Sequence, residues 1–134
     1  MWSILNNQLL YEITFGGSVV DLIIGREGTP LANQIVSLSR DGILRVSAVE
    51  TGDEVKTIKF DNECFSIAID KSQTVIAVGT GNRLNHCVTF IDSANYTKVK
   101  EVYFNDRINS LAFNERNDCM IAVTYSGEVH SFEF

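Results

Sequence analysis

The sequence has almost no proline and no long apolar run. Pro30 is the single proline in 134 residues. No apolar run approaches the roughly 18 residues of a membrane-spanning helix, which excludes a span of that kind. The amino terminus also lacks the basic and apolar regions of a secretory signal peptide. Together these absences predict a soluble protein of the cytosol or the nucleus.

Cysteine is scarce, and its positions do not suggest a metal site. Cys64, Cys87 and Cys119 form no CxxC pair, and there is no cluster of His and Cys ligands at short spacing. Each cysteine lies beside apolar residues in a strand-like run. This setting predicts three buried thiols in the reduced form. We therefore expect no metal and no cofactor.

No segment concentrates positive charge. The formal net charge is −6, and Asp and Glu are spread along the chain. Nucleic acids and anionic membranes both need concentrated Lys and Arg, so we expect neither as a main partner. A hydrophobic content of 45% with 21% charged residues is ordinary for a globular protein, and the length suits one domain.

The sequence does contain a repeated pattern of short β-favouring runs. Runs rich in Val, Ile, Phe and Thr alternate with turn residues, and no long window has the period of a helix. Three runs end in phenylalanine, at Phe15, Phe60 and Phe104, which are 45 and 44 residues apart. A second apolar run follows each of them after a short polar turn. We expect outer strands at 9–15, 54–60 and 98–104, and inner strands at 19–24, 64–69 and 108–113.

Each copy of the pattern holds four short strands in about 44 residues, which is typical of one propeller blade. The sequence therefore predicts an all-β fold, a partial β-propeller of about three four-stranded antiparallel blades. We expect one partial propeller domain over 1–134, with blade-like repeats at roughly 16–60, 61–104 and 105–134, and 1–15 ending a preceding blade. Closed rings have about 4–8 blades. The isolated chain is therefore expected not to be a stable monomer, but to self-associate, misfold or require the remaining blades from a partner or from the rest of its own chain.

One segment carries a family resemblance. "DGILRVSAVETG", residues 41–52, resembles a WD repeat of the beta-transducin type, with Ser47 and Ala48 in the place of Trp-Asp. Gly16 and Gly17 stand where the family has a Gly-His pair, so its hydrogen-bonded set of His, Asp, Ser and Trp cannot form in full. Asp41 could still accept local hydrogen bonds at its turn. Other propeller families also fit the strand pattern.

The resemblance implies a face for binding proteins. In a WD-type propeller, the loops into the inner strand and those between the second and third strands share one face, and polar loops on a rigid scaffold commonly bind partners. For any single residue, an ordinary solvated turn is an equally good interpretation. The implied partner-binding residues are Arg40, Asp41, Asp61, Asn62, Glu63, Arg83, Asn85, His86, Asn105, Asp106 and Arg107.

Catalytic motifs are not evident. His86 and His130 are the only histidines, and nothing in the sequence supports a catalytic dyad, in which a nucleophile is held beside a base. The "GTGN" segment at 79–82 precedes a strand, whereas a phosphate loop needs a following helix. Its glycines are more simply expected to allow a turn with positive φ.

We expect a non-catalytic protein-interaction scaffold of WD-repeat type, within a larger propeller or a multiprotein complex. Its partners would be other proteins or the remaining blades of a propeller. Two alternatives remain. One is a segment of a cofactor-binding propeller enzyme, although the inner strands offer only Asp21 to a central channel. The other is a structural piece that completes another subunit's ring.

Overall fold

The computed structural model describes residues 12, 14, 16–82, 85–114 and 119–133. These residues form eleven β-strands and no helix, so the described part of the chain has no helix that could cross a membrane. The strands belong to three antiparallel sheets. The predicted all-β class with antiparallel sheets is therefore confirmed.

The first two sheets have four strands each, arranged in chain order. The first sheet consists of β1 (Val19–Ile24), β2 (Gln34–Ser39), β3 (Ile43–Ala48) and β4 (Glu54–Lys59). The second consists of β5 (Glu63–Ile69), β6 (Val75–Gly81), β7 (His86–Asp92) and β8 (Thr97–Phe104). Each strand pairs with the next through a short connection, as the alternation of β-favouring runs and turn residues predicts.

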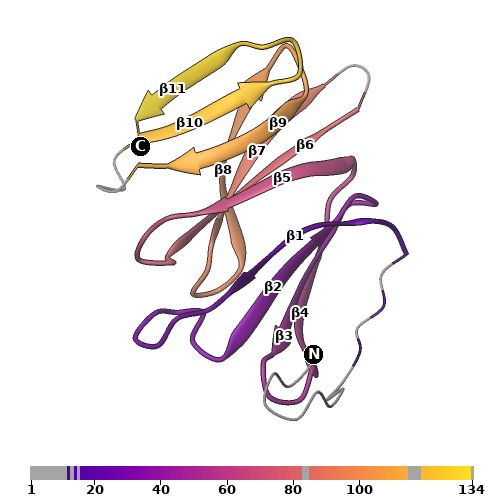
Figure 1. Ribbon diagram of the computed structural model, residues 1–134, viewed down its shortest axis with the longest axis vertical. Coiled ribbons are helices and arrows are strands. Elements are labelled where there is room, and N and C mark those ends of the chain that lie inside the picture. The colour runs from indigo at the N-terminus through magenta and orange to yellow at the C-terminus, as the bar shows by residue number, and fades with distance from the viewer. Residues whose placement is uncertain (1–11, 13, 15, 83–84, 115–118, 134) are drawn as a thin grey trace.

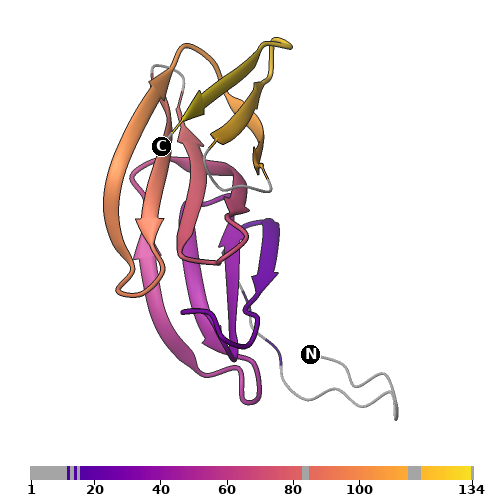
Figure 2. The same ribbon diagram turned by 90° about the vertical axis from the view of Figure 1, so that its left-hand side faces the viewer.

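The third sheet has three strands among the described residues. It consists of β9 (Ile108–Phe113), β10 (Cys119–Thr124) and β11 (Val129–Glu133). The second sheet lies between the other two, and its strand β5 neighbours β1 of the first sheet and β9 of the third (Figure 1 and Figure 2). This order brings the turns at one end of the three sheets close together.

The predicted inner and outer strands agree with β1, β4, β5, β8 and β9 to within one residue at each end. The predicted strand at 9–15 lies mostly outside the described residues. Its two described members, Glu12 and Thr14, are not in a strand. The 44-residue period thus located the later strands well, because each is fixed by pairing with its own neighbours in the sheet.

Apolar side chains of the second sheet pack on both sides. Ile76 and Val78 of β6 join a cluster with residues of the first sheet, such as Leu38. Ala77, between them in sequence, packs instead with Ile108 and residues of the third sheet. Successive strand residues point to opposite faces, so this alternation buries both faces of β6.

Buried polar contacts also join the sheets. Gln73, which is 5% exposed, lies in the turn between β5 and β6. Its Oε1 accepts hydrogen bonds from the amide of Arg26 over 2.8 Å and from the hydroxyl of Thr29 over 2.9 Å. On the other side, the Ser66 hydroxyl donates to the carbonyl of Ile108 over 3.1 Å. These bonds fix the relative position of neighbouring sheets.

The prediction of a positive-φ turn at "GTGN" is wrong. Gly79 and Gly81 lie in β6, and neither has a positive φ. Glycine is required at both positions because neighbouring atoms leave no room for a Cβ. A Cβ on Gly79 would lie 2.4 Å from Ser66 Oγ, and one on Gly81 would lie 2.3 Å from His86 Nδ1.

The glycine pair before β1 also has a steric reason. A Cβ on Gly16 would lie 2.9 Å from Asp41 Oδ2, and one on Gly17 would lie 3.2 Å from Asp41 Cβ. The backbone therefore passes directly against the β2–β3 turn. The expectation that Asp41 accepts a local hydrogen bond is confirmed, because the Ser39 hydroxyl donates to it.

The expectation for the cysteines is confirmed in part. All three are free, and Cys64 is buried. Cys87 and Cys119 are only half-buried, contrary to the prediction. Cys87 is the second residue of β7, in the half-buried start of that strand, and Cys119 is the first residue of β10.

Candidate functional site

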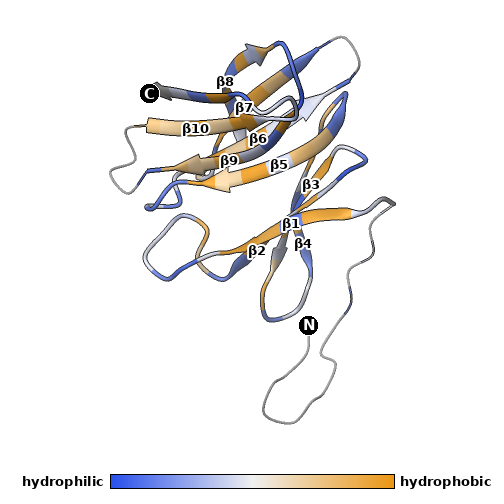
Figure 3. Cartoon of the chain, turned by 45° about the horizontal axis from the view of Figure 1, so that its top comes forward, coloured by the Kyte–Doolittle hydropathy of each residue, from blue (hydrophilic) through white to orange (hydrophobic). Residues whose placement is uncertain are grey.

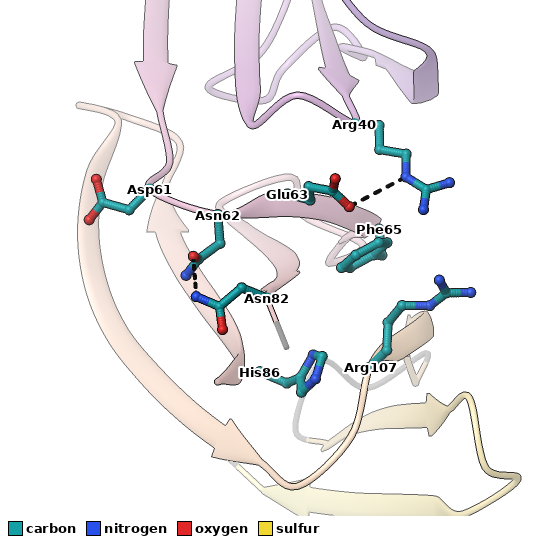
Figure 4. A pocket seen from close by; sticks show the side chains of 9 residues that line it. Arg40, Asp61, Asn62, Glu63, Phe65, Asn82, His86 and Arg107 are labelled. Carbon is teal, nitrogen blue, oxygen red and sulfur yellow. Dashed lines mark hydrogen bonds and ion pairs between the residues drawn. The ribbon is translucent and has the colours of Figure 1, made fainter. Parts of the chain in front are cut away.

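A hollow lies where turns of all three sheets meet (Figure 4). Its volume is about 520 Å³. The first sheet contributes Arg40 and the third contributes Arg107, while the remaining side chains come from the second sheet. The lining residues are Arg40, Asp61, Asn62, Glu63, Phe65, Gly81, Asn82, His86 and Arg107. We call this hollow the turn pocket.

The backbone of the β2–β3 turn holds Arg40 in place. Gly42 has a φ of 95°, a conformation that glycine adopts without steric cost. The amide of Phe60 donates to the carbonyl of Gly42 over 2.8 Å, and the amide of Cys64 donates to the carbonyl of Arg40 over 3.2 Å. The turn of the first sheet is thereby attached to the segment that enters the second sheet.

An asparagine pair closes the opposite side of the pocket. Asn82 Nδ2 donates to Asn62 Oδ1 over 2.8 Å. Asn82 Oδ1 accepts a hydrogen bond from the amide of Asn85 over 2.9 Å. The two loops are therefore tied together by side chains from sequence positions 20 residues apart.

Arginine and aromatic side chains alternate along another wall. The Arg40 guanidinium carbon lies 5.3 Å from the ring centroid of Phe65, and that of Arg107 lies 4.9 Å from the same centroid. Arg107 also lies 4.7 Å from the ring centroid of Tyr125. A guanidinium over a ring at such distances is a favourable cation–π contact. We call Arg40, Phe65, Arg107 and Tyr125 the stacked row.

Sequence analysis did not identify the two aromatic members of the stacked row. Phe65 is an aromatic residue at a half-buried position of a predicted inner strand. Tyr125 precedes Ser126-Gly127, just as Arg40 precedes Asp41-Gly42, so the alignment of repeats places both before the same turn. This equivalence between the repeats was the sequence signal from which Tyr125 could have been predicted as a neighbour of the pocket.

Two of the predicted acidic residues stabilise turns. Asp106 accepts hydrogen bonds from the amide of Ser126 over 2.7 Å and from that of Arg107 over 2.8 Å. Side-chain and backbone hydrogen bonds from Ser126, followed by the Arg107 amide, lower the pKa of Asp106. Asp41 plays a comparable part in its own turn, where it accepts the Ser39 hydroxyl. Neither residue lines the turn pocket.

The structure gathers six of the predicted partner-binding residues in the turn pocket and places four elsewhere. Those in the pocket are Arg40, Asp61, Asn62, Glu63, His86 and Arg107. Asn85 lines a neighbouring hollow of about 310 Å³, and Asn105 and Asp106 line a third of about 200 Å³. Asp41 remains at its turn, and Arg83 lies outside the described residues.

The two histidines occupy different settings. His86 begins β7 at the edge of the pocket, and no described group hydrogen-bonds its buried Nδ1. His130 lies 3.0 Å from Glu128 Oε2 and packs edge-on against Phe104. Among the described residues, no group of three or more His, Cys, Asp and Glu is placed to hold a metal ion.

Comparisons with known proteins bear on the fold. No family model matches the sequence, and no curated protein matches it either. The structure resembles the β-propeller domain of Swd1 (Cps50) from Myceliophteria thermophila with a TM-score of 0.72 at 12% identity, over 90% of this chain and 35% of that one. It resembles Sqt1 of Saccharomyces cerevisiae with a TM-score of 0.83 at 18% identity, over 98% and 38%.

A third likeness is to the propeller of Dos1, with a TM-score of 0.66 at 13% identity. It covers 75% of this chain and 28% of that one. The chain thus spans about a third of the length of the Swd1 domain and of Sqt1, and less of Dos1. The three antiparallel sheets of this chain have the fold of a β-propeller segment.

Proposed function

We propose that this chain is a non-catalytic protein-interaction scaffold of the WD-repeat type, working in the cytoplasm or the nucleus. It would form part of a larger propeller or of a multiprotein complex. The observation that carries the proposal is the turn pocket, to which three sheets contribute polar and aromatic side chains. A surface assembled from several repeats on a rigid framework suits the recognition of another protein.

The local structure around residues 41–52 supports the WD-repeat assignment. The Asp41-Gly42 turn leads into β3, which is the third strand of its sheet. Ser47, in the place of the family's Trp, is 1% exposed and therefore faces the interior. The repeat thus has an Asp-Gly turn that resembles the family's, although it lacks the family's Trp-Asp pair.

Photocrosslinking from the turn pocket tests the proposal. Asp61 is exposed and lines the pocket, whereas Lys56 is also exposed but lies on β4, outside the pocket. We expect benzoylphenylalanine at position 61 to form a discrete protein adduct in cells, and the same group at position 56 to form none.

The adduct is then identified by mass spectrometry, and its binding is measured with purified proteins. Binding that disappears in the Asn62→Ala, Asn82→Ala double variant would support the pocket as the docking site. Identical adducts from positions 61 and 56 would contradict the proposal.

A further inference from the structure

We propose that the turn pocket binds the side-chain carboxylate of an acidic residue in a partner peptide, held between Arg40 and Arg107. This inference rests on the proposed function, because it names the chemistry of the partner at the same pocket. Phe65 lies between the two arginines and forms an apolar surface beside the bound group (Figure 4). Tyr125 extends that surface beyond Arg107.

Convergence of the two arginines is the first argument. They belong to turns of different sheets, 67 positions apart in the sequence, yet both lie within 5.3 Å of the Phe65 centroid. Figure 4 shows both side chains extending to the same side of the ring. Two cations held this close repel each other, so a group of negative charge between them relieves the repulsion.

The hydrogen-bond donors of the two arginines are the second argument. Arg40 Nε lies 3.6 Å from Glu63 Oε2, and Arg107 Nε donates to Asn109 Oδ1 over 2.9 Å. Among the described residues, no hydrogen bond or ion pair involves the terminal Nη atoms of either arginine. A guanidinium has five N–H donors in a planar fork that matches a carboxylate. Stacking on a ring occupies its face and leaves this edge available.

Competition from the protein's own acidic groups is weak. The side chains of Arg40 and Glu63 are 54% and 59% exposed, and an exposed pair at 3.6 Å contributes little free energy. Asp106, next to Arg107, is already engaged by two backbone amides. A carboxylate from a partner can therefore displace Glu63 from Arg40 at small cost.

Because the net charge of the chain is −6, it can attract negative charge only close to the two arginines. A strongly acidic partner would be repelled by the chain as a whole, whereas one or two carboxylates placed at the arginines are attracted. Apolar residues beside the carboxylate would lie on Phe65 and Tyr125. The expected ligand is thus a linear peptide in which an Asp or Glu is flanked by apolar residues.

Fluorescence anisotropy with labelled peptides tests the inference. The probes share the sequence Gly-Ser-Phe-X-Phe-Ser-Gly with blocked ends, where X is glutamate, glutamine or phosphoserine. A fourth probe carries glutamine at X and a free carboxyl terminus. The measurement uses the full chain in whichever oligomeric state melts cooperatively, so that the protein is known to be folded. We expect the glutamate peptide to bind at least about tenfold more tightly than each of the other three.

Arginine variants show whether the binding occurs at the proposed place. We expect Arg40→Gln and Arg107→Gln each to weaken binding of the glutamate peptide about tenfold. Arg26→Gln is the matched control, because it removes the same charge from an exposed loop residue whose amide alone makes the contact to Gln73. Arg40→Lys and Arg107→Lys should weaken binding less, since lysine keeps the charge but lacks the planar fork.

Equal binding of the glutamate and glutamine peptides would overturn the inference, as would equal effects of the three Arg→Gln variants. Tighter binding of the phosphoserine peptide, or of the peptide with a free carboxyl terminus, would overturn the assignment to a side-chain carboxylate. A partner that crosslinks from position 61 and binds Arg40→Gln and Arg107→Gln as well as the wild type would leave the proposed function intact. That result would refute only the inference that Arg40 and Arg107 bind a carboxylate of the partner.

Discussion

At the scale of single residues, burial separates the chemistry of the three cysteines. Cys64 is fully buried, and desolvation, with a smaller contribution from the charge of Asp41, raises the pKa of its thiol to about 12. The thiolate is the reactive form of cysteine, so this side chain is unreactive at neutral pH. Cys87 and Cys119 are only half-buried.

We therefore predict that iodoacetamide at pH 8 modifies Cys119 and leaves Cys64 unmodified in the folded protein. Peptide mass spectrometry after a short exposure measures the two sites separately. In urea, where the core is open, both should react at similar rates. Modification of Cys64 at the rate of Cys119 in the folded protein would show that this thiol is not shielded.

The raised pKa of Cys64 also makes the stability of the fold depend on pH above about pH 9. The folded state holds the proton more tightly than the unfolded state, whose thiol has an ordinary pKa of 9.0. The corresponding stability is complete below about pH 9 and is lost as the pH rises towards 12. A Cys64→Ala variant should show a smaller loss of melting temperature over that range than the wild type does.

Asp106 gives the free energy of unfolding the opposite pH dependence, because its contribution is lost as the pH falls. Hydrogen bonds from Ser126 and the Arg107 amide lower its pKa in the folded state below the ordinary value of 3.8. The stability that it provides is therefore complete at neutral pH and is lost as the pH falls through the lowered pKa. We predict that Asp106→Asn lowers the free energy of unfolding at pH 7 and reduces its decline in acid.

Urea titrations at several pH values measure both effects for Asp106. Glu27→Gln is the control, because it removes the same charge from an exposed residue of the β1–β2 connection in the first sheet, whereas Asp106 precedes β9 of the third sheet. An acid dependence that is the same in Asp106→Asn and in the wild type would rule out this role of the carboxylate.

At the scale of strands, close packing between sheets restricts which residues fit. Gly79 in β6 pairs with Ser66 of β5, and Ile108 of the third sheet lies close to the position that a Cβ on Gly79 would occupy. An added Cβ would lie 2.4 Å from Ser66 Oγ and 3.3 Å from Ile108 Cβ. Overpacking of this kind usually costs about 1–3 kcal/mol.

We accordingly predict that Gly79→Ala lowers the free energy of unfolding by about 1–3 kcal/mol. Adding Ser66→Ala removes the nearest atom, so the double variant should recover part of the loss although Ser66→Ala alone is destabilising. Chemical unfolding of the wild type, both single variants and the double variant completes the cycle. Strict additivity of the two changes would argue against the steric explanation.

Much of the strand pattern could be predicted from the sequence, because it depends on neighbours within one sheet. Asp41-Gly42 marks its turn by composition alone, and β5 and β9 follow from the repeat. The stacked row could not be predicted in the same way. Arg40 and Phe65 meet only because two sheets lie side by side. Gln73, likewise, has an ordinary turn sequence around it, and nothing in that sequence indicates a partner in another sheet.

At the scale of the whole molecule, the first sheet exposes apolar side chains on β1. Val19, Leu22 and Ile24 are 51%, 53% and 58% exposed. The ribbon of β1 is coloured as hydrophobic over most of its length (Figure 3). In the third sheet, Val129 of β11 is 67% exposed. Apolar groups gathered on a blade face mark an interface or cause aggregation.

We predict that the isolated 134-residue chain self-associates at micromolar concentration unless further blades cover these faces. Leu22→Lys with Ile24→Lys should lower the measured mass towards that of a monomer. Size-exclusion chromatography with light scattering measures this. Val99→Lys is the control, because Val99 is 67% exposed but lies on the outer strand β8. A wild-type chain that stays monomeric and melts cooperatively would refute the prediction.

The burial of β6 on both faces has a consequence for motion. All its residues except Val75 are buried, and its neighbours in the second sheet are β5 and β7. Its amide protons lie in the hydrogen-bonded ladders to β5 and β7, so they can meet solvent only when those strands separate, whereas β1 is an edge strand that can fray locally. Amide hydrogen exchange should therefore be slowest in β6 and faster outward in both directions, so that the middle sheet is the last part of the molecule to open.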